Sequence, residues 1–283
     1  LEINRLDDSI LADKMKHESA ARYAPWVRDL RVLRDHELSD DLEKLFLDKS
    51  TSGRTAWTRL FDETLADMRC QVGNENLTLT EAFNRLSDPK EDRRKAAAKA
   101  IGASLSEKKS LFTLITNVLA KDKAVEDQWR KYPRPVSSRN LANLVEDEVV
   151  EALVTAVKDS YASTSHRYYA LKAKWYGKEK LDHWDRNAPL PNVEHRDIPW
   201  AEARETVQGA YADFSGKLAE ITDMFFTKNW IDAPARPGKA SGAFSHSVVP
   251  SAHPYILLNY LGTPNDVMTL AHELGHGVHQ VLA

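Results

Sequence analysis

Long runs with the helical period of 3.6 residues constrain this chain more than any other feature. Such runs cover residues 39–50, 53–68 and 88–131, and two more helices are expected before Trp230. Residues 144–177 are predicted to form one amphipathic helix, whose inward face is Val149, Val150, Leu153, Val154 and Val157. The fold class is therefore predicted to be mainly α, with a multi-helix body.

Two stretches depart from the helical period and predict a minor β component. "RCQVGNENLTLT" (69–80) has a turn-forming centre between short β-prone runs, which predicts a small hairpin. Residues 232–266 are rich in Gly, Pro and Ser and contain two β-prone stretches, 242–249 and 254–260. We therefore divide the chain into a helical body (1–230) and a small β element with a final helix (231–283). A long loop is expected at 182–200.

Composition narrows the classes of partner. The net charge of −3 gives no indication of a nucleic-acid or membrane-surface partner. No apolar run approaches the ~20 residues that a membrane-spanning helix needs. The single cysteine, Cys70, is expected to be a half-buried apolar residue, and the absence of a cysteine pair favours a reducing, cytoplasmic setting. Because the chain begins with Leu1 and not Met, we expect it to start inside a longer protein.

The last residues predict a helix with a well-defined start. Thr263 is a suitable N-cap, Pro264 is tolerated at the first helical position, and Asp266 stands where a capping box has an acid. At 100° per residue, His272 and His276 then lie on one face, one turn apart. Both imidazoles can reach one zinc ion at ~2.0–2.1 Å.

Glu273 lies about 100° from His272 around the same helix, so it flanks the ion without joining its ligands. This position suits a general base that takes a proton from a water activated by zinc. A separate apolar stripe is expected on the side away from Glu273, consisting of Val267, Ala271, Leu274, Val278 and Leu282.

Two glycines, Gly275 and Gly277, lie inside this helix and cost about 1 kcal/mol each relative to alanine. A close backbone approach by a strand or a substrate is expected to offset this cost. A chance match to H-E-x-x-H is the alternative, and the capped helix, the separate apolar face and the glycines argue against it. His279 is expected to line the cavity near the metal, since the metzincin pattern fails at this residue and at Leu282. His246 and His253 are expected to be structural or solvated.

The stretch "GKASGAFSHSVVPSAHPYILLNYLGTPNDVMTLAHELGHGVHQVLA" (238–283) resembles the core of the oligoendopeptidase F group of the M3, thimet-oligopeptidase-like, zinc peptidases. A weaker resemblance extends back to "LRVLRDHELSDDLEKLFLDKS" (30–50). The resemblance implies a cytosolic endopeptidase of short peptides with a two-lobed helical fold around a channel. It implies Zn²⁺ held by His272 and His276, with Glu273 as general base.

The resemblance also implies a third zinc ligand, a glutamate, some twenty residues beyond the motif, and later groups that stabilise the oxyanion. None of these positions occurs in this sequence. On this basis the chain is expected to be a middle fragment of a protein about twice as long, to have little activity alone, and to need the missing C-terminal part of the same protein as its partner.

The two β-prone stretches near the motif lead to a substrate hypothesis. An exposed edge of 254–260 or of "SGAF" could pair with an extended peptide, with Gly242, Ala243, Phe244 and Tyr255 as substrate-binding residues. The alternative is that both strands only pack. Two other functions remain open: a zinc carboxypeptidase-like hydrolase, which needs a basic group for a C-terminal carboxylate, and a non-catalytic helical scaffold with an incidental motif.

Overall fold

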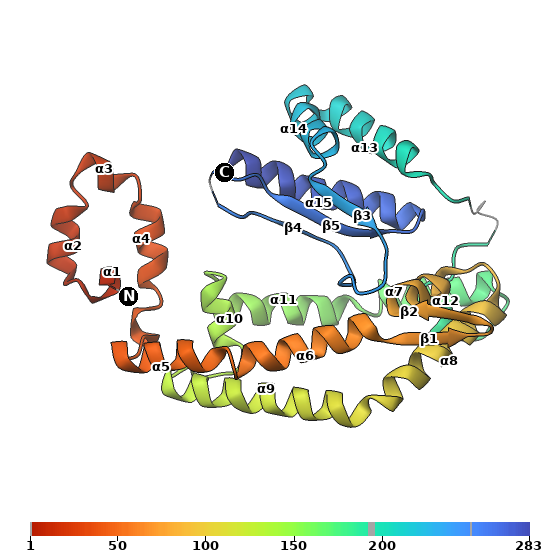
Figure 1. Cartoon of the computed structure of the whole chain (residues 1–283), viewed down its shortest axis with the longest axis horizontal. Helices are drawn as coiled ribbons and strands as arrows, with labels where there is room; N and C mark the ends of the chain where they lie inside the picture. Colours follow the sequence, from red (N-terminus) through yellow and green to blue (C-terminus); the bar gives the residue numbers. More distant parts are fainter. Residues whose placement is uncertain (1, 192–195, 250) are drawn as a thin grey trace. The chain divides into compact units, whose positions relative to one another are not determined.

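The computed structural model describes residues 2–191, 196–249 and 251–283. Its elements are mainly helices, with one hairpin and one three-stranded sheet (Figure 1). The contacts divide the chain into two compact units, one of residues 1–61 and 109–168, the other of residues 62–108 and 169–283. The division between residues 230 and 231, which rests on element type, stays a prediction. In the described parts of the chain, every helix is too short or too polar to span a bilayer.

The first unit is built from helices. Its elements are α1 (Glu2–Arg5), α2 (Asp8–Lys14), α3 (Glu18–Ala21), α4 (Ala24–Arg31), η1 (Arg34–His36), α5 (Asp40–Ser50), α9 (Lys109–Trp129), α10 (Ser137–Ala142) and α11 (Asp147–Ser160), with most of α6 (Arg54–Asp67). Glu43 of α5 and Arg130 form a two-pronged ion pair at 2.7 and 2.9 Å, which ties α5 to the end of α9.

The second unit contains both sheets. Its elements are β1 (Arg69–Val72), β2 (Glu75–Thr78), α7 (Leu79–Asn84), η2 (Arg85–Ser87), α8 (Glu91–Glu107), most of α12 (Ser165–Trp175), η3 (His183–Asp185), α13 (Trp200–Phe214), α14 (Gly216–Thr227), β3 (Ile231–Pro234), β4 (Phe244–His246), β5 (Tyr255–Tyr260) and α15 (Pro264–Leu282). The predicted hairpin is confirmed as β1 and β2, with Gly73 at φ +60° in its turn. Cys70 is fully buried in it.

The sheet beside α15 has the strand order β3–β5–β4. β3 runs parallel to β5, and β4 runs antiparallel to it with Phe244 opposite Leu257 and His246 opposite Tyr255. The two predicted β stretches are confirmed in shorter form as β4 and β5. β3 was not predicted, because "IDAP" is four residues long and ends in a proline.

The core of the second unit lies between α15, this sheet and the helix pair α13–α14 (Figure 1). Ile256 and Leu258 of β5 alternate inward and are 1–2% exposed, as expected for a strand with one buried face. Leu270 and Leu274 of α15 and Phe225 of α14 are completely buried. The predicted β element and final helix therefore share one core with α13 and α14.

The prediction of a single helix over 144–177 was wrong. α11 ends at Ser160 and α12 begins at Ser165, and the hydroxyls of Ser160, Ser163 and Thr164 bond to nearby backbone carbonyls in the break. The inward face predicted for it was also wrong, because Val149, Leu153, Val154 and Val157 are 43–64% exposed. The loop expected at 182–200 begins with η3, and its residues 192–195 lie outside the described residues.

Candidate active site

Helix α15 begins as the sequence predicts. The Thr263 hydroxyl accepts the N–H of Asp266, and the Asp266 carboxylate accepts the N–H of Thr263 at 2.9 Å, so the capping box is complete. The same carboxylate accepts the N–H of Leu261 at 3.1 Å. Only three residues join β5 to this helix, and Gly262 among them has φ +88°. The start of the helix, and with it the histidine face, is therefore fixed relative to β5.

His272 and His276 are exposed and point at each other across one turn. Their Nε2 atoms lie 3.1 Å apart and their rings are perpendicular. Two nitrogens held ~2.0–2.1 Å from one ion in a tetrahedral arrangement would lie about 3.3 Å apart. The pair therefore fits two ligands of one zinc ion. His279 is exposed, and no third side chain among the described residues completes a three-ligand group with the pair.

Glu273 is buried to 7% exposure although its neighbour His272 is exposed. The predicted apolar stripe needs correction at two points. Leu282 is 51% exposed, and the buried face of α15 is rotated toward Glu273, since Leu270 and Gly277 on that side are buried. Glu273 thus lies at the border between the core and the histidine face, where water is partly excluded.

The two glycines of the motif are explained by helices and not by a strand or a substrate. A Cβ on Gly277 would lie 2.6 Å from Cζ of Phe225 on α14. A Cβ on Gly275 would lie 3.2 Å from the Tyr211 hydroxyl of α13, which donates to the carbonyl of Ala271 at 2.8 Å. Burial raises the pKa of Tyr211, so this hydroxyl stays protonated. α13 and α14 therefore pack directly against the backbone of the motif.

The segment between β3 and β4 is fastened from two sides. The Lys239 ammonium is almost completely buried and donates to the carbonyls of Asp232, Pro234 and Leu258 at 2.6–3.0 Å. From β5, the Asn259 amide donates to the carbonyls of Ala240 and Gly242, both at 2.9 Å. Gly242 has φ +84°, a conformation that glycine adopts without strain. This explains the local role of the "GKASG" residues.

The strand topology corrects one substrate hypothesis and keeps the other. β5 is the central strand and is paired on both sides, so 254–260 offers no open edge. β4 is an edge strand among the described residues, and Ser245 and Gln280 exchange two hydrogen bonds that hold it against α15. His253 is structural, as expected, because its ring stacks on Trp230 at 3.9 Å. His246 is exposed in β4.

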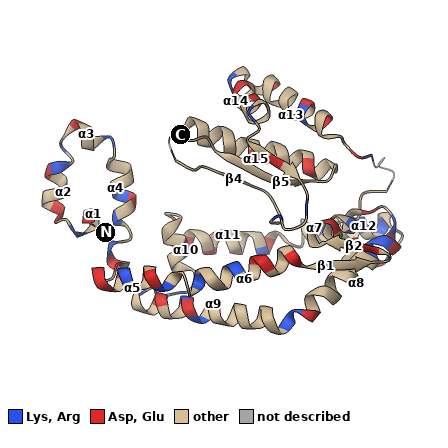
Figure 2. Cartoon of the chain, in the orientation of Figure 1, with Lys and Arg blue, Asp and Glu red and all other residues tan. Residues whose placement is uncertain are grey.

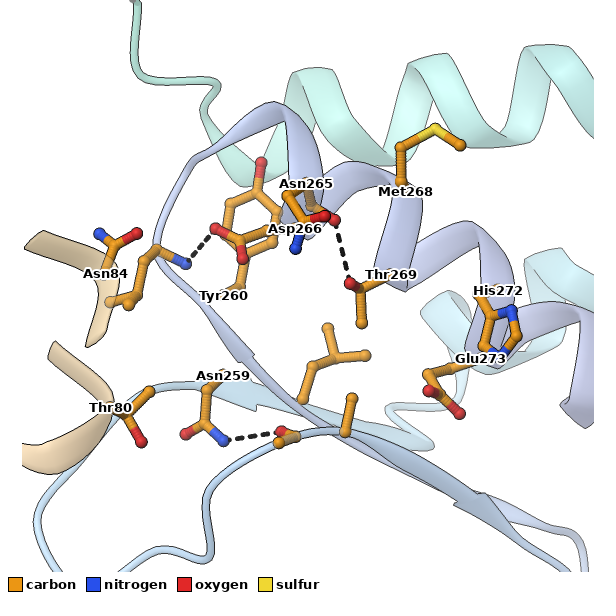
Figure 3. Close-up of a pocket in the computed structure, with 14 residues that line it drawn as sticks. Thr80, Asn84, Asn259, Tyr260, Asn265, Asp266, Met268, Thr269, His272 and Glu273 are labelled. Atoms are coloured by element: carbon orange, nitrogen blue, oxygen red, sulfur yellow. Dashed lines mark hydrogen bonds between the residues drawn. The ribbon is translucent and has the colours of Figure 1, made fainter. Parts of the chain in front are cut away.

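A cavity of about 630 Å³ opens beside the motif (Figure 3). His272 and Glu273 lie at one end of it, the N-terminal half of α15 and β5 form its length, and Thr80 and Asn84 of α7 form a further wall. Of the predicted substrate residues, Gly242 and Ala243 line this cavity. Phe244 lines a separate cavity of about 290 Å³, and Tyr255 is 51% exposed at the start of β5.

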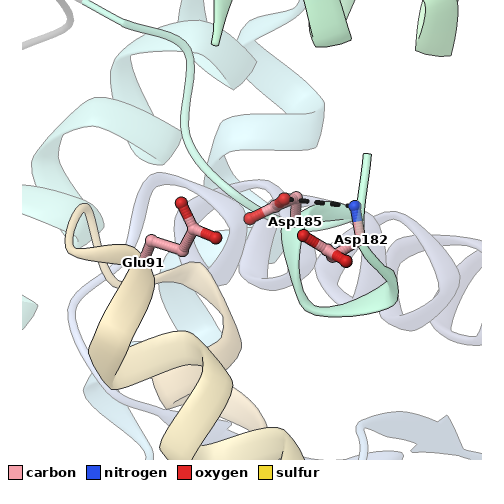
Figure 4. A group of neighbouring side chains, drawn as sticks. All are labelled: Glu91, Asp182 and Asp185. Carbon is pink, nitrogen blue, oxygen red and sulfur yellow. Dashed lines mark hydrogen bonds between the residues drawn. The ribbon is translucent and has the colours of Figure 1, made fainter. Parts of the chain in front are cut away.

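A second group of possible ligands is Glu91, Asp182 and Asp185, whose oxygens lie within 4.8 Å of one another (Figure 4). The Lys178 ammonium donates to all three carboxylates at 2.6–3.1 Å. Burial alone would raise the pKa of Asp185, but hydrogen bonds from Arg94 and Lys178 hold it below 3.8. The three acids therefore already share a cation, and the group is best described as an ion-pair network in which Asp185 is buried and the other two acids are exposed.

Comparison with known families decides the identity of the chain. The family model described as "Peptidase family M3" matches residues 85–283, and one described as "Oligopeptidase F" matches residues 2–69. The chain belongs to peptidase family M3. Relatives include oligopeptidase PepF of Bacillus subtilis, 25% identical over 96% of this chain, and group B oligopeptidase PepB of Streptococcus agalactiae, 31% identical over 59%. These alignments cover 41% and 27% of the two relatives.

Solved structures agree with the M3 fold. An oligoendopeptidase F structure from Bacillus anthracis superposes with a TM-score of 0.78 at 20% identity, over 93% of this chain and 49% of that one. PZ peptidase A with an inhibitor gives 0.78 at 22% identity, over 92% and 46%. The chain therefore spans about half the length of the relatives it matches or less.

Several residues that shape the candidate site were not predicted from the sequence. Lys239 and Asn259 occur in quoted motifs, but only their contacts reveal that they fasten the segment before β4. Thr80 and Asn84 reach the cavity from a helix almost 200 positions earlier in the chain. No local pattern indicates such a contact, because it depends on tertiary structure.

Proposed function

We propose that the full-length protein is a zinc-dependent oligopeptidase in which His272 and His276 bind the metal and Glu273 is the general base. The observation that carries the proposal is the pair of Nε2 atoms 3.1 Å apart beside a buried glutamate, at the end of a cavity. The named oligopeptidases among the relatives support short peptides as substrates. A third ligand, expected to be a glutamate beyond residue 283, and a cytoplasmic location stay predictions.

The chemistry follows from what each residue is able to do. Bound Zn²⁺ supplies the Lewis acidity that makes a water nucleophilic near neutral pH. Glu273 accepts the proton of that water and can return it to the leaving amine. Its partial burial removes competing water, and the contacts of Tyr211 and Phe225 with α15 keep it in position.

An extended peptide is expected to pair with the edge strand β4, next to Gly242 and Ala243. Backbone hydrogen bonds to β4 would give affinity with little dependence on side chains. Phe244 and Tyr255, both about half exposed, are kept as candidates for contacts with the peptide further from the motif.

Two alternative functions are less well supported. A carboxypeptidase needs a basic group for the terminal carboxylate, and none of the described residues that line the cavity at the motif is Lys or Arg. A scaffold with an incidental motif would bury His272 and His276 among apolar side chains, whereas both are exposed. Membership of family M3 also favours a peptidase.

The decisive test compares Glu273→Gln with the unmodified full-length protein in zinc content and in hydrolysis of a short fluorogenic peptide. The variant should keep its zinc and lose about 10²–10⁴-fold in kcat, since general acid–base catalysis contributes that much. Unchanged kcat would refute the role of Glu273. Residues 1–283 alone are expected to bind zinc weakly and to show little turnover, because loss of even one oxyanion donor costs ~10²–10³ in rate.

A further inference from the structure

The cavity beside the motif has an unusual charge distribution. Residues 240–283 contain no Lys or Arg, although the whole chain has 39 of them, and their only acids are Asp266 and Glu273. Both acids line the cavity. In Figure 2 the helix α15 accordingly carries acidic residues and no basic ones. The charged side chains that line the cavity are therefore both acidic, and both come from α15.

The end of the cavity away from the histidines is formed by Asp266, Asn265 and Asn84 (Figure 3). Asp266 precedes His272 by six residues, which is about 9 Å along the helix axis at a rise of 1.5 Å per residue. The bonds from Leu261 and Thr263 fix the Asp266 carboxylate in place. The positive end of the helix dipole offsets about half a charge at this end, so the acid still leaves it negative.

The side walls of the cavity also carry hydrogen-bond acceptors, the amide oxygens of asparagine side chains. Asn259 uses its amide nitrogen to hold the carbonyls of Ala240 and Gly242, and its oxygen is turned toward Thr80 (Figure 3). Asn84 lies on the facing wall. A side chain that extends from the His272 end of the cavity would therefore pass the apolar side chains of Leu258 and Leu261. Its tip would then lie among oxygen acceptors. Such a shape suits a long side chain with a cationic tip.

We propose that this cavity is a specificity site for a lysine or arginine side chain next to the cleaved bond, and that it rejects aspartate and glutamate. The inference rests on the proposed peptidase function and adds the substrate class to it. Asp266 pairs with the cationic tip, Asn84 and Asn259 accept hydrogen bonds from it, and Met268 and Leu261 contact its stem. An acidic side chain would meet like charge and no donor from Lys or Arg among the described lining residues.

The test uses zinc-loaded full-length protein and a set of fluorogenic peptides. The peptides differ only in one position next to the cleaved bond, which carries Lys, Arg, Gln, norleucine or Glu, on each side of the bond in turn. On one side, kcat/KM should be about tenfold higher for Lys and Arg than for norleucine, and lower still for Glu, since tenfold corresponds to one well-formed charged contact.

Charge substitutions in the cavity wall should shift this preference in opposite directions. Asn84→Asp should strengthen the preference for Lys over Glu, and Asn84→Lys should reverse it. Met268→Glu and Met268→Lys repeat the pair at a position that is 70% exposed, where neither change threatens folding. Asn76→Lys is the matched control, because Asn76 is exposed in β2 and does not line the cavity. It should leave the profile unchanged.

Failure of this inference differs from failure of the proposed function. Turnover with equal kcat/KM for Lys and Glu peptides, or profiles that do not respond to Asn84 and Met268, would overturn the specificity site and leave the peptidase intact. If no peptide is cleaved, the proposed function fails. Fluorescence anisotropy with the same peptides then tests whether the cavity prefers a cationic side chain. Tighter binding of Lys than Glu peptides, lost in Asn84→Lys, would support it, and equal affinities would refute it.

Discussion

The ring of Phe225 on α14 lies directly against the backbone of Gly277 on α15, so that an added Cβ would come within 2.6 Å of its Cζ. Phe225 is completely buried and has little room to move. Gly277→Ala should therefore destabilise the protein by about 1–3 kcal/mol, as overpacking does, despite the better helix propensity of alanine. Thermal or urea unfolding measures this change.

Gly102 provides the matched control, because it lies inside α8 with no atom within 4 Å of an added Cβ. Gly102→Ala should stabilise by up to about 1 kcal/mol. When Phe225→Leu is combined with Gly277→Ala, the double variant should recover part of the stability that Gly277→Ala alone loses, since the two residues share one contact. If Gly277→Ala is as benign as Gly102→Ala, the close approach of the two helices is wrong.

Replacing each of the three histidines of α15 should change the zinc affinity by different amounts. Loss of a residue that only orients a metal ligand typically weakens metal binding by ~10–100-fold. In the full-length protein, His272→Ala and His276→Ala each remove a ligand and should weaken zinc binding by more than this. His279→Ala should change zinc affinity little, because His279 does not join a three-ligand group with the pair. Competition with a chromogenic chelator measures the three affinities, and equal losses in all of them would contradict the assignment.

Lys239 should contribute far more to the stability of the fold than its exposed neighbour Arg236, although both pair with Asp232. Lys239→Met would leave three carbonyls without their donor in a nearly closed environment, so we expect a loss of about 2–4 kcal/mol. Arg236→Met removes only an exposed ion pair and should cost less than about 1 kcal/mol. Hydrogen exchange should also accelerate at residues 240–246 in the first variant only; similar exchange in both would argue against the fastening role.

Asp185 and Glu91 both bind Lys178 at 2.6 Å, but only Asp185 is buried. Asp185→Asn should lower the free energy of unfolding by about 3–5 kcal/mol, because Arg94 loses its charge partner in the interior. Glu91→Gln should lower it by less than about 1 kcal/mol. Since the pKa of Asp185 is lowered on folding, its contribution is present above about pH 3.8 and is lost as the pH falls through the lower folded value. Unfolding free energies measured across acid pH should show a shallower decline in Asp185→Asn.

The start of α15 and the histidine geometry could be predicted from sequence because they depend on near neighbours. Thr263, Pro264 and Asp266 define the cap within four positions, and one helical turn relates His272 to His276. The hairpin at Gly73 likewise depends on a local turn. In such cases the chemistry of adjacent residues decides the structure, and no tertiary contact overrides it.

The remainder depends on contacts between distant residues. The burial of Glu273 depends on the elements that pack against α15, and the wall at Asn84 belongs to α7, so neither follows from the motif itself. The break after Ser160 had a local indication in "YASTS", where hydroxyls compete for backbone carbonyls, but the valine periodicity outweighed it. β3 became recognisable only through its pairing with β5.

Residues 240–283 contain no Lys or Arg, so a protease that cuts only at these residues leaves the site on one peptide. Trypsin cuts after Lys and Arg, so complete digestion releases β4, β5, the cavity wall they form and the H-E-x-x-H sequence together, on one peptide that begins at Ala240. The cut that frees this peptide follows Lys239, whose side chain is 3% exposed, so the folded protein should resist it. Mass spectrometry of that single fragment could thus report both the chemical labelling of the site and the integrity of the fold around it.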